Sequence, residues 1–203
     1  SLDDVAGQYV KELQGSAYGQ TRIRDLLRMS SGVTFSERYD GADDISRLSR
    51  AVATGWPATV EVLRQFQDRH SPPGAKFVYA SAETEVLGRV LTAATGKTMA
   101  ELTQQWIWEP MGAEHDAFWC TGKDRQAAAY FCFNASLRDW GRLGVMLAQD
   151  GRIGGPMGGP MGGRQIIPRE YLLDATDASR QPSAFRPYQA TPFTGYGYQF
   201  WLH

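Results

Sequence analysis

The chain has 203 residues, a formal net charge of −1, and ordinary shares of apolar (42%) and charged (21%) residues. A chain of this length can bury a hydrophobic core, so one domain, or one domain with a subdomain, is expected. The near-neutral charge argues against a nucleic acid or an anionic membrane as partner, since both require a clustered basic surface. Its apolar runs are a few residues long, far short of the roughly 20 that span a bilayer.

Hydrophobic periodicity and helix-end signals predict a mostly helical chain. The expected helices cover residues 1–13, 21–29, 45–53, 57–69, 82–96, 99–109, 135–148 and 168–173. Thr21 is the expected N-cap of the second helix, and Pro57 is expected in the first turn of the fourth. The stretch 154–163 contains only Gly, Pro and two Met, so it is expected to be a mobile, exposed loop.

One strand is expected near the end of the chain, over residues 195–202, where aromatic residues alternate with others. A strand needs a partner, and few candidates precede it, so part of its sheet is expected to lie outside these residues. The predicted fold class is predominantly α with a small β component.

Cys120 and Cys132 are too few for a disulfide framework and have no CxxC spacing. They are expected to be buried thiols that behave as small hydrophobic side chains. The three histidines, His70, His115 and His203, show no metal-ligand spacing. The sequence therefore predicts no metal site, and nothing in it indicates an organic cofactor.

Tyr79-Ala80-Ser81 is the most informative motif of the chain. A phenol and a hydroxyl two residues apart follow a Ser-Pro-Pro-Gly breaker run and open a helical pattern that ends at Gly96. The motif resembles the Tyr-x-Asn or Tyr-x-Ser motif of the serine β-lactamase and penicillin-binding-protein-like hydrolases.

Further segments resemble the same family in the same order, in the branch that holds class C β-lactamases, esterases, D-amino-acid peptidases and nylon-oligomer hydrolases. They are residues 1–4 (SLDD), 23–33 (IRDLLRMSSGV), 77–81 (FVYAS), 108–113 (WEPMGA), 135–144 (ASLRDWGRLG) and 195–201 (GYGYQFW). The resemblance implies part of the β-lactamase/transpeptidase-like α+β fold. Residues 1–194 would form its mainly helical domain, and residues 195–203 would begin the strand region.

Three departures from the family pattern bear on function. No serine is followed by lysine three positions later, so the nucleophile motif Ser-x-x-Lys is absent from these 203 residues. The third motif, Lys-Thr-Gly or His-x-Gly, would lie beyond His203. Ser81 stands where many members have Asn and, together with Tyr39, is most similar to the nylon-oligomer-hydrolase and esterase side of the family.

The resemblance therefore implies a fragment of a serine hydrolase that cleaves an amide, lactam or ester in a small-molecule or peptide-like substrate through an acyl-enzyme. The chain by itself is expected to be inactive. The alternative is a non-catalytic, degenerate relative that binds a peptide or cell-wall fragment.

Three residues are the candidates for the site. The resemblance implies that Tyr79 is the catalytic residue, and a phenol can move protons if nearby positive charge lowers its pKa; otherwise Tyr79 is a core tyrosine with a bonded hydroxyl. Ser81 is expected to contact the substrate amide or the absent lysine, or to cap the helix that follows. Tyr39 is expected to line the substrate pocket, or to be a surface aromatic. Arg138 and Asp139 are expected to form a solvated helix start with a local ion pair.

Overall fold

A computed structural model of the chain describes residues 1–154, 163–182, 185 and 193–203. Its longer helices are α2 (Asp44–Thr54), α4 (Ser81–Thr95), α6 (Leu137–Ala148) and α7 (Arg169–Thr176). The shorter ones are α1 (Ile23–Leu27), α3 (Thr59–Gln65), α5 (Met99–Thr103), the single turns η1 (Ala6–Gln8), η2 (Lys11–Leu13) and η4 (Ala178–Arg180), and the π-helical turn η3 (Gln104–Trp108). The predominantly α class with a small β component is confirmed.

The β component consists of three separate antiparallel pairs in the described part of the chain. β1 (Phe118–Trp119) pairs with β2 (Phe133–Asn134), β3 (Arg152–Ile153) with β4 (Arg164–Gln165), and β5 (Gly195–Tyr196) with β6 (Trp201–Leu202). The expectation of one long strand at 195–202 is wrong. The segment turns back on itself, with Gln199 at a positive φ of 63°. As a result β5 and β6 pair with each other and satisfy each other's backbone hydrogen-bonding groups.

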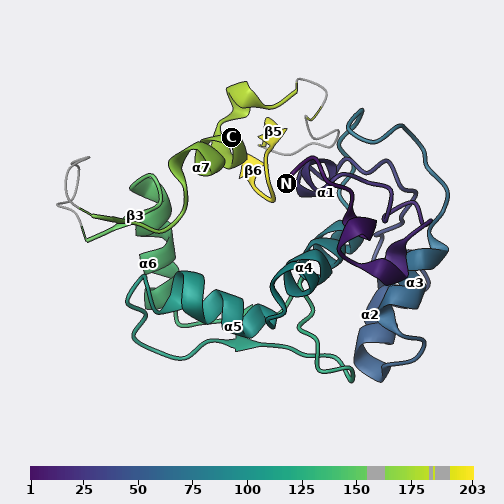
Figure 1. The fold of residues 1–203 in the computed structure, drawn as a ribbon, viewed down its shortest axis with the longest axis horizontal. Helices are drawn as coiled ribbons and strands as arrows, with labels where there is room; N and C mark the ends of the chain where they lie inside the picture. The colour runs from purple at the N-terminus through teal and green to yellow at the C-terminus, as the bar shows by residue number, and fades with distance from the viewer. Residues whose placement is uncertain (155–162, 183–184, 186–192) are drawn as a thin grey trace.

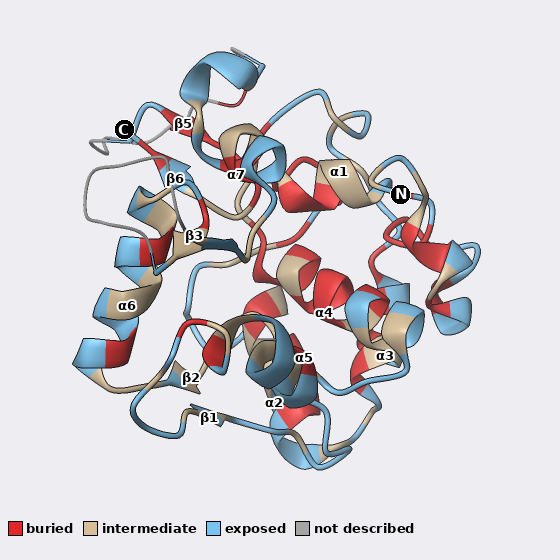
Figure 2. Cartoon of the chain, turned by 60° about the vertical axis from the view of Figure 1, so that its left-hand side comes forward, coloured by how far each residue is buried: buried red, intermediate tan, exposed pale blue. Residues whose placement is uncertain are grey.

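The elements follow one another around a ring in Figure 1, from the N-terminal segment and α1 through α2–α4, then α5 and α6, then α7, and back to β5 and β6 beside α1. Figure 2 shows that burial is concentrated on α4 and its neighbours, whereas α6 is mostly exposed or half-buried. The main core is built from residues of the N-terminal turns and α1–α4, with Leu13, Leu26, Leu48, Leu63 and Val86 fully buried.

A second, smaller core lies beside the start of α4. Met29, Phe77, Phe185 and Tyr196 are buried there, and Tyr79 packs against them. Thus the C-terminal hairpin and the segment before α4 share one aromatic cluster, which joins parts of the chain about 120 residues apart.

Several predicted boundaries are corrected by the structure. The expected helix 1–13 is two separate turns, η1 and η2, because Val5 before the first turn and Val10 between the two are extended. The helix expected from Pro57 begins at Thr59, after a cis Trp56–Pro57 peptide. The helix expected over 99–109 changes to π-helical geometry at Gln104. Residues 155–162 of the Gly/Pro/Met repeat lie outside the described residues.

The expectation of two buried thiols is also wrong. Cys120 and Cys132 form a disulfide with their Cα atoms 5.4 Å apart. Cys120 is exposed, and its backbone N–H donates to the Cys132 carbonyl at 3.0 Å. Pairing of β1 with β2 brings the two residues together, and their spacing of 12 in sequence gave no indication of it.

Candidate active site

Tyr79 lies just before α4, on a segment held to the residues that follow α1 by the hydrogen bond from Val78 N–H to the Met29 carbonyl (2.9 Å). Its ring is half-buried and stacks on Trp201 with 5.5 Å between ring centroids and 23° between the planes. The C-terminal hairpin therefore forms one wall of the position that Tyr79 occupies.

Ser81 is the first residue of α4, and Ala80 is the N-cap without a side-chain capping bond. The predicted cap by Ser81 itself is not formed. Instead, the helix start is satisfied by a residue far away in sequence: the Ser81 N–H donates to Glu37 Oε2 at 2.8 Å, and the Ser81 hydroxyl donates to Glu37 Oε1 at 2.6 Å. A carboxylate at a helix N-terminus is favoured by the unpaired N–H groups and the helix dipole.

Tyr39 joins the same carboxylate. Its hydroxyl donates to Glu37 Oε1 at 2.5 Å, while the ring is 73% exposed. The structure thus brings both candidate substrate-binding residues, Tyr39 and Ser81, onto Glu37. Sequence reasoning missed Glu37, because the polar loop 35–44 shows no local sign that one of its carboxylates reaches α4.

The loop that carries Glu37 and Tyr39 is tied down by two aspartates. Asp43 Oδ2 accepts the backbone N–H groups of Arg38 and Tyr39, each at 2.6 Å, and Asp44 Oδ2 accepts the Ser36 N–H at 2.8 Å. The hydrogen bonds of Asp43, first that from the Ser46 hydroxyl, lower its pKa to about 2. Tyr39 has a positive φ of 58°, a conformation that costs energy for a non-glycine residue and is common at functional sites.

Burial raises the pKa of Tyr79, and the negative charge of Glu37 raises it further, while the Ser81 hydroxyl acts in the opposite direction. The hydrogen bond to Glu37 is also the main reason that the pKa of Tyr39 is raised. Both phenols therefore hold their protons at neutral pH. Tyr79 can act as a proton donor in this arrangement, and it becomes a base only when a cation is placed beside it.

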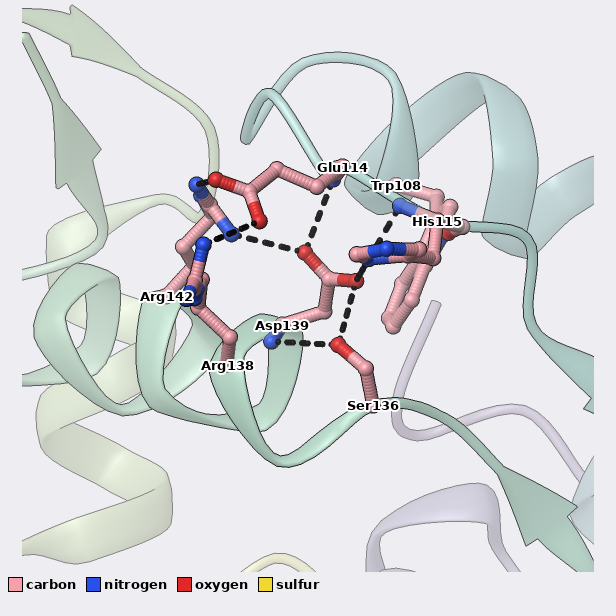
Figure 3. Close-up of polar contacts among 7 residues, drawn as sticks. All are labelled: Trp108, Glu114, His115, Ser136, Arg138, Asp139 and Arg142. Atoms are coloured by element: carbon pink, nitrogen blue, oxygen red, sulfur yellow. Dashed lines mark hydrogen bonds and ion pairs between the residues drawn. The ribbon is translucent and has the colours of Figure 1, made fainter.

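A second polar cluster lies at the start of α6 and is shown in Figure 3. The Asp139 side chain is fully buried and accepts from the Glu114 N–H (2.8 Å), the Ser136 hydroxyl (2.7 Å) and Arg142 (2.9 Å). These hydrogen bonds, first that from the Glu114 N–H, lower the pKa of Asp139 to about 2. The expectation of a solvated Asp139 is wrong, although Arg138 does form an exposed ion pair, with Glu114 at 3.0 Å.

This cluster borders a cavity of about 490 Å³. Its aromatic walls include Trp108, Phe118, Trp119 and Phe133, and Trp108 Nε1 donates to the His115 carbonyl at 2.8 Å. Tyr79 and Ser81 are not among its lining residues. Because each polar group of Asp139 is engaged with the protein itself, the cluster serves to fasten residues 114–115 to α6.

The described residues contain no group of three or more His, Cys, Asp or Glu side chains arranged to hold a metal ion. Within the same ranges, no helix has both the length and the apolar character needed to cross a bilayer.

The Beta-lactamase family model matches residues 1–203. The chain belongs to the beta-lactamase family. Its curated relatives include the 6-aminohexanoate-dimer hydrolase of Paenarthrobacter ureafaciens, which is 28% identical in an alignment of 153 residues; the match covers 71% of this chain and 38% of the relative. The chain is thus related to serine hydrolases and spans well under half the length of this relative.

Solved structures of family members share the fold. A Bacillus anthracis protein provisionally named as a 6-aminohexanoate-dimer hydrolase superposes with a TM-score of 0.76 at 23% identity, covering 98% of this chain and 51% of that one. A class C β-lactamase from Rhodobacter sphaeroides gives a TM-score of 0.56 at 16% identity, covering 97% of this chain and 53% of that one. At these identities the likeness concerns the fold, and the beta-lactamase-family chain spans about half of each.

Proposed function

We propose that this chain is part of a serine hydrolase that cleaves an amide, lactam or ester bond through an acyl-enzyme. The observation that carries the proposal is the position of Tyr79, half-buried beside the Glu37–Ser81 contact at the start of α4. A phenol, an alcohol and a second phenol from Tyr39 thereby gather around one helix N-terminus. The name of the Paenarthrobacter relative supports a linear amide, such as the 6-aminohexanoate dimer, as the first substrate to test.

In the proposed reaction, a serine outside these 203 residues attacks the acyl carbon and gives up its proton to a neighbouring base. The tetrahedral intermediate expels the amine or alcohol, which takes a proton, and water then hydrolyses the acyl-enzyme. Tyr79 is the proposed carrier of that proton. Its raised pKa keeps the phenol protonated, and a lysine ammonium placed nearby would lower the pKa and let the same phenol release and accept a proton in turn.

The chain alone lacks a Ser-x-x-Lys nucleophile, so we expect no turnover of nitrocefin, p-nitrophenyl acetate or the 6-aminohexanoate dimer, and no covalent adduct with a fluorescent penicillin. The longer protein that contains this chain should hydrolyse at least one of them. Turnover or a serine adduct with residues 1–203 alone would contradict the proposal. A folded longer protein that binds these compounds without hydrolysing them would favour the non-catalytic binding role.

The role of Tyr79 is tested in that longer protein by Tyr79→Phe. The variant keeps the ring that stacks on Trp201 and loses one hydroxyl, so its melting temperature should stay close to that of the wild type. Loss of general acid–base help lowers kcat by about 10²- to 10⁴-fold. Tyr171→Phe is the control, since Tyr171 lies on α7, keeps its ring contact with Tyr198 in this variant, and is not among the groups that act on the pKa of Tyr79. Full activity of Tyr79→Phe would remove Tyr79 from the reaction.

A further inference from the structure

Glu37 is the common acceptor of the site. Its Oε1 accepts the hydroxyl protons of Tyr39 (2.5 Å) and Ser81 (2.6 Å), and its Oε2 accepts the Ser81 N–H (2.8 Å). We propose that Glu37 determines which groups of this site donate hydrogen bonds and which accept them. In this way it selects substrates that present an N–H group. This inference rests on the proposed function of the chain as part of an acyl-cleaving enzyme.

The selectivity follows from the hydrogen-bond inventory of the groups involved. A carboxylate accepts hydrogen bonds and donates none, whereas a hydroxyl has one proton and two lone pairs. Tyr39 is exposed and directs its only hydroxyl proton to Glu37, so its oxygen has only lone pairs left for a ligand. A secondary amide can donate its N–H to such an oxygen. An ester offers an oxygen acceptor in the same place, so the hydroxyl oxygen is left without a hydrogen-bond donor.

Glu37 is held in place by structure on both sides. The loop before it is fixed by Asp44, which accepts both the N–H and, at 3.0 Å, the hydroxyl of Ser36, and the loop after it is fixed by Asp43. On the other side stands the 15-residue helix α4, whose N-cap supplies no side-chain bond of its own. Rigid support of this kind is what a residue needs if it is to orient two hydroxyl groups.

The charge of Glu37 also reaches Tyr79. Burial and Glu37 raise the pKa of Tyr79, and Tyr39 and Tyr196 are the other titratable groups that interact with it. Asp43 and Tyr79 act on Tyr39 in the same direction as Glu37 does. The same carboxylate that orients the hydroxyls therefore keeps both phenols protonated, which is consistent with donation of a proton by Tyr79 to a leaving amine.

The first test uses residues 1–203 and needs no activity. Tyrosine ring carbons are labelled with ¹³C at Cζ, assigned with Tyr39→Phe and Tyr79→Phe, and titrated by NMR. Glu37→Gln should lower the pKa of Tyr79 and of Tyr39 relative to the wild type. Asp40→Asn is the matched control, because Asp40 lies on the same exposed loop and pairs with Arg38 instead. Equal tyrosine titrations in wild type and Glu37→Gln would overturn the arrangement.

The second test uses the longer protein and a pair of isosteric substrates, a secondary amide and its ester. Glu37→Gln should lower kcat/KM for the amide by about 10-fold or more relative to the ester, while Asp40→Asn leaves the ratio unchanged. Glu37→Asp, which keeps the carboxylate, should recover part of the ratio and guards against a folding defect in the Gln variant. An unchanged ratio in folded Glu37→Gln would overturn the proposal. Absence of all activity in the wild type would instead contradict the proposed function, and the NMR result would still decide the placement of Glu37.

Discussion

Glu83 is a carboxylic acid sealed inside the core, only 1% exposed. Its Oε1 accepts the Ser31 hydroxyl at 2.7 Å, and the Ser31 N–H also points to it at 3.3 Å. Burial nevertheless dominates and raises the pKa of Glu83 to about 8. Unlike Glu37, this side chain has no opening to the proposed site, so its effect is expected on stability.

The sign of that effect follows from proton linkage. Between the unfolded pKa of 4.5 and the folded pKa of about 8, the folded chain holds one proton more than the unfolded chain. The free energy of unfolding therefore falls as pH rises through this window, by up to about 1.4 kcal/mol per pH unit from this group. Glu83→Gln removes this pH-dependent contribution to the free energy of unfolding. The stability of the variant relative to wild type should therefore increase from pH 5 to pH 8.

Urea unfolding at pH 5, 6, 7 and 8 measures this prediction. The matched control is Glu61→Gln, a change at an exposed position of α3, which should track the wild type across the series. Parallel pH curves for wild type and Glu83→Gln would show that the buried carboxyl does not titrate in this window.

At the scale of elements, α4 and α6 carry glycines in opposite situations. A Cβ added at Gly88 in α4 would lie 2.4 Å from the Ala129 Cβ, whereas a Cβ at Gly144 in α6 would meet nothing within 4 Å. Glycine inside a helix costs about 1 kcal/mol relative to alanine when space is free. Close packing against Ala129 therefore explains why position 88 of α4 is a glycine. No neighbouring atom requires a glycine at position 144 of α6.

We expect Gly88→Ala to lower the free energy of unfolding by about 1–3 kcal/mol through overpacking. Gly144→Ala should instead raise it by up to about 1 kcal/mol. Chemical denaturation of both variants checks the pair, and the double variant Gly88→Ala/Ala129→Gly should recover stability because the clashing methyl group is removed. Two stabilised single variants would contradict the close contact between α4 and residue 129.

At the scale of the whole molecule, the C-terminal hairpin closes the chain onto its N-terminal part. Arg24 donates to the Tyr198 hydroxyl at 2.5 Å, the Gln199 N–H donates to the Leu27 carbonyl at 2.9 Å, and the Thr84 hydroxyl donates to Gln199 at 2.6 Å. The Tyr198 ring is 2% exposed and belongs to the main core. These contacts place Trp201 over Tyr79, so stability and site geometry depend on the same closure.

Tyr198→Ala should lower the free energy of unfolding by about 3–5 kcal/mol, the usual range for deleting a buried aromatic side chain. Tyr198→Phe keeps the ring and loses only the hydrogen bond with Arg24, for about 1–2 kcal/mol. Urea denaturation ranks the two variants. A loss below about 1 kcal/mol in Tyr198→Ala would mean that residues 195–203 contribute little to the fold.

Local sequence signals were sufficient to predict much of the helical content. The expected helix over 45–53 corresponds to α2, in which Asp43 provides the N-cap and Gly55 the left-handed C-cap. The helix after the Tyr motif ends before Gly96 as expected, again in a left-handed C-cap. Such features depend on neighbouring residues along the chain, so sequence reasoning can reach them. The ordered motifs also pointed to the family that the comparison confirms.

By itself, then, the sequence determined the helical character, the family and the identity of Tyr79, Ser81 and Tyr39 as candidates, while the division at 194 and their roles stay predictions. Only the tertiary structure decided which partners these residues meet. Glu37 and Ser81 are 44 residues apart, and Ser31 and Glu83 are 52 apart. The Cys120–Cys132 disulfide and the β5–β6 hairpin likewise depend on where the chain turns. Hydrogen-bonding and burial energies depend on distance in space, which propensities that act over a few residues do not encode.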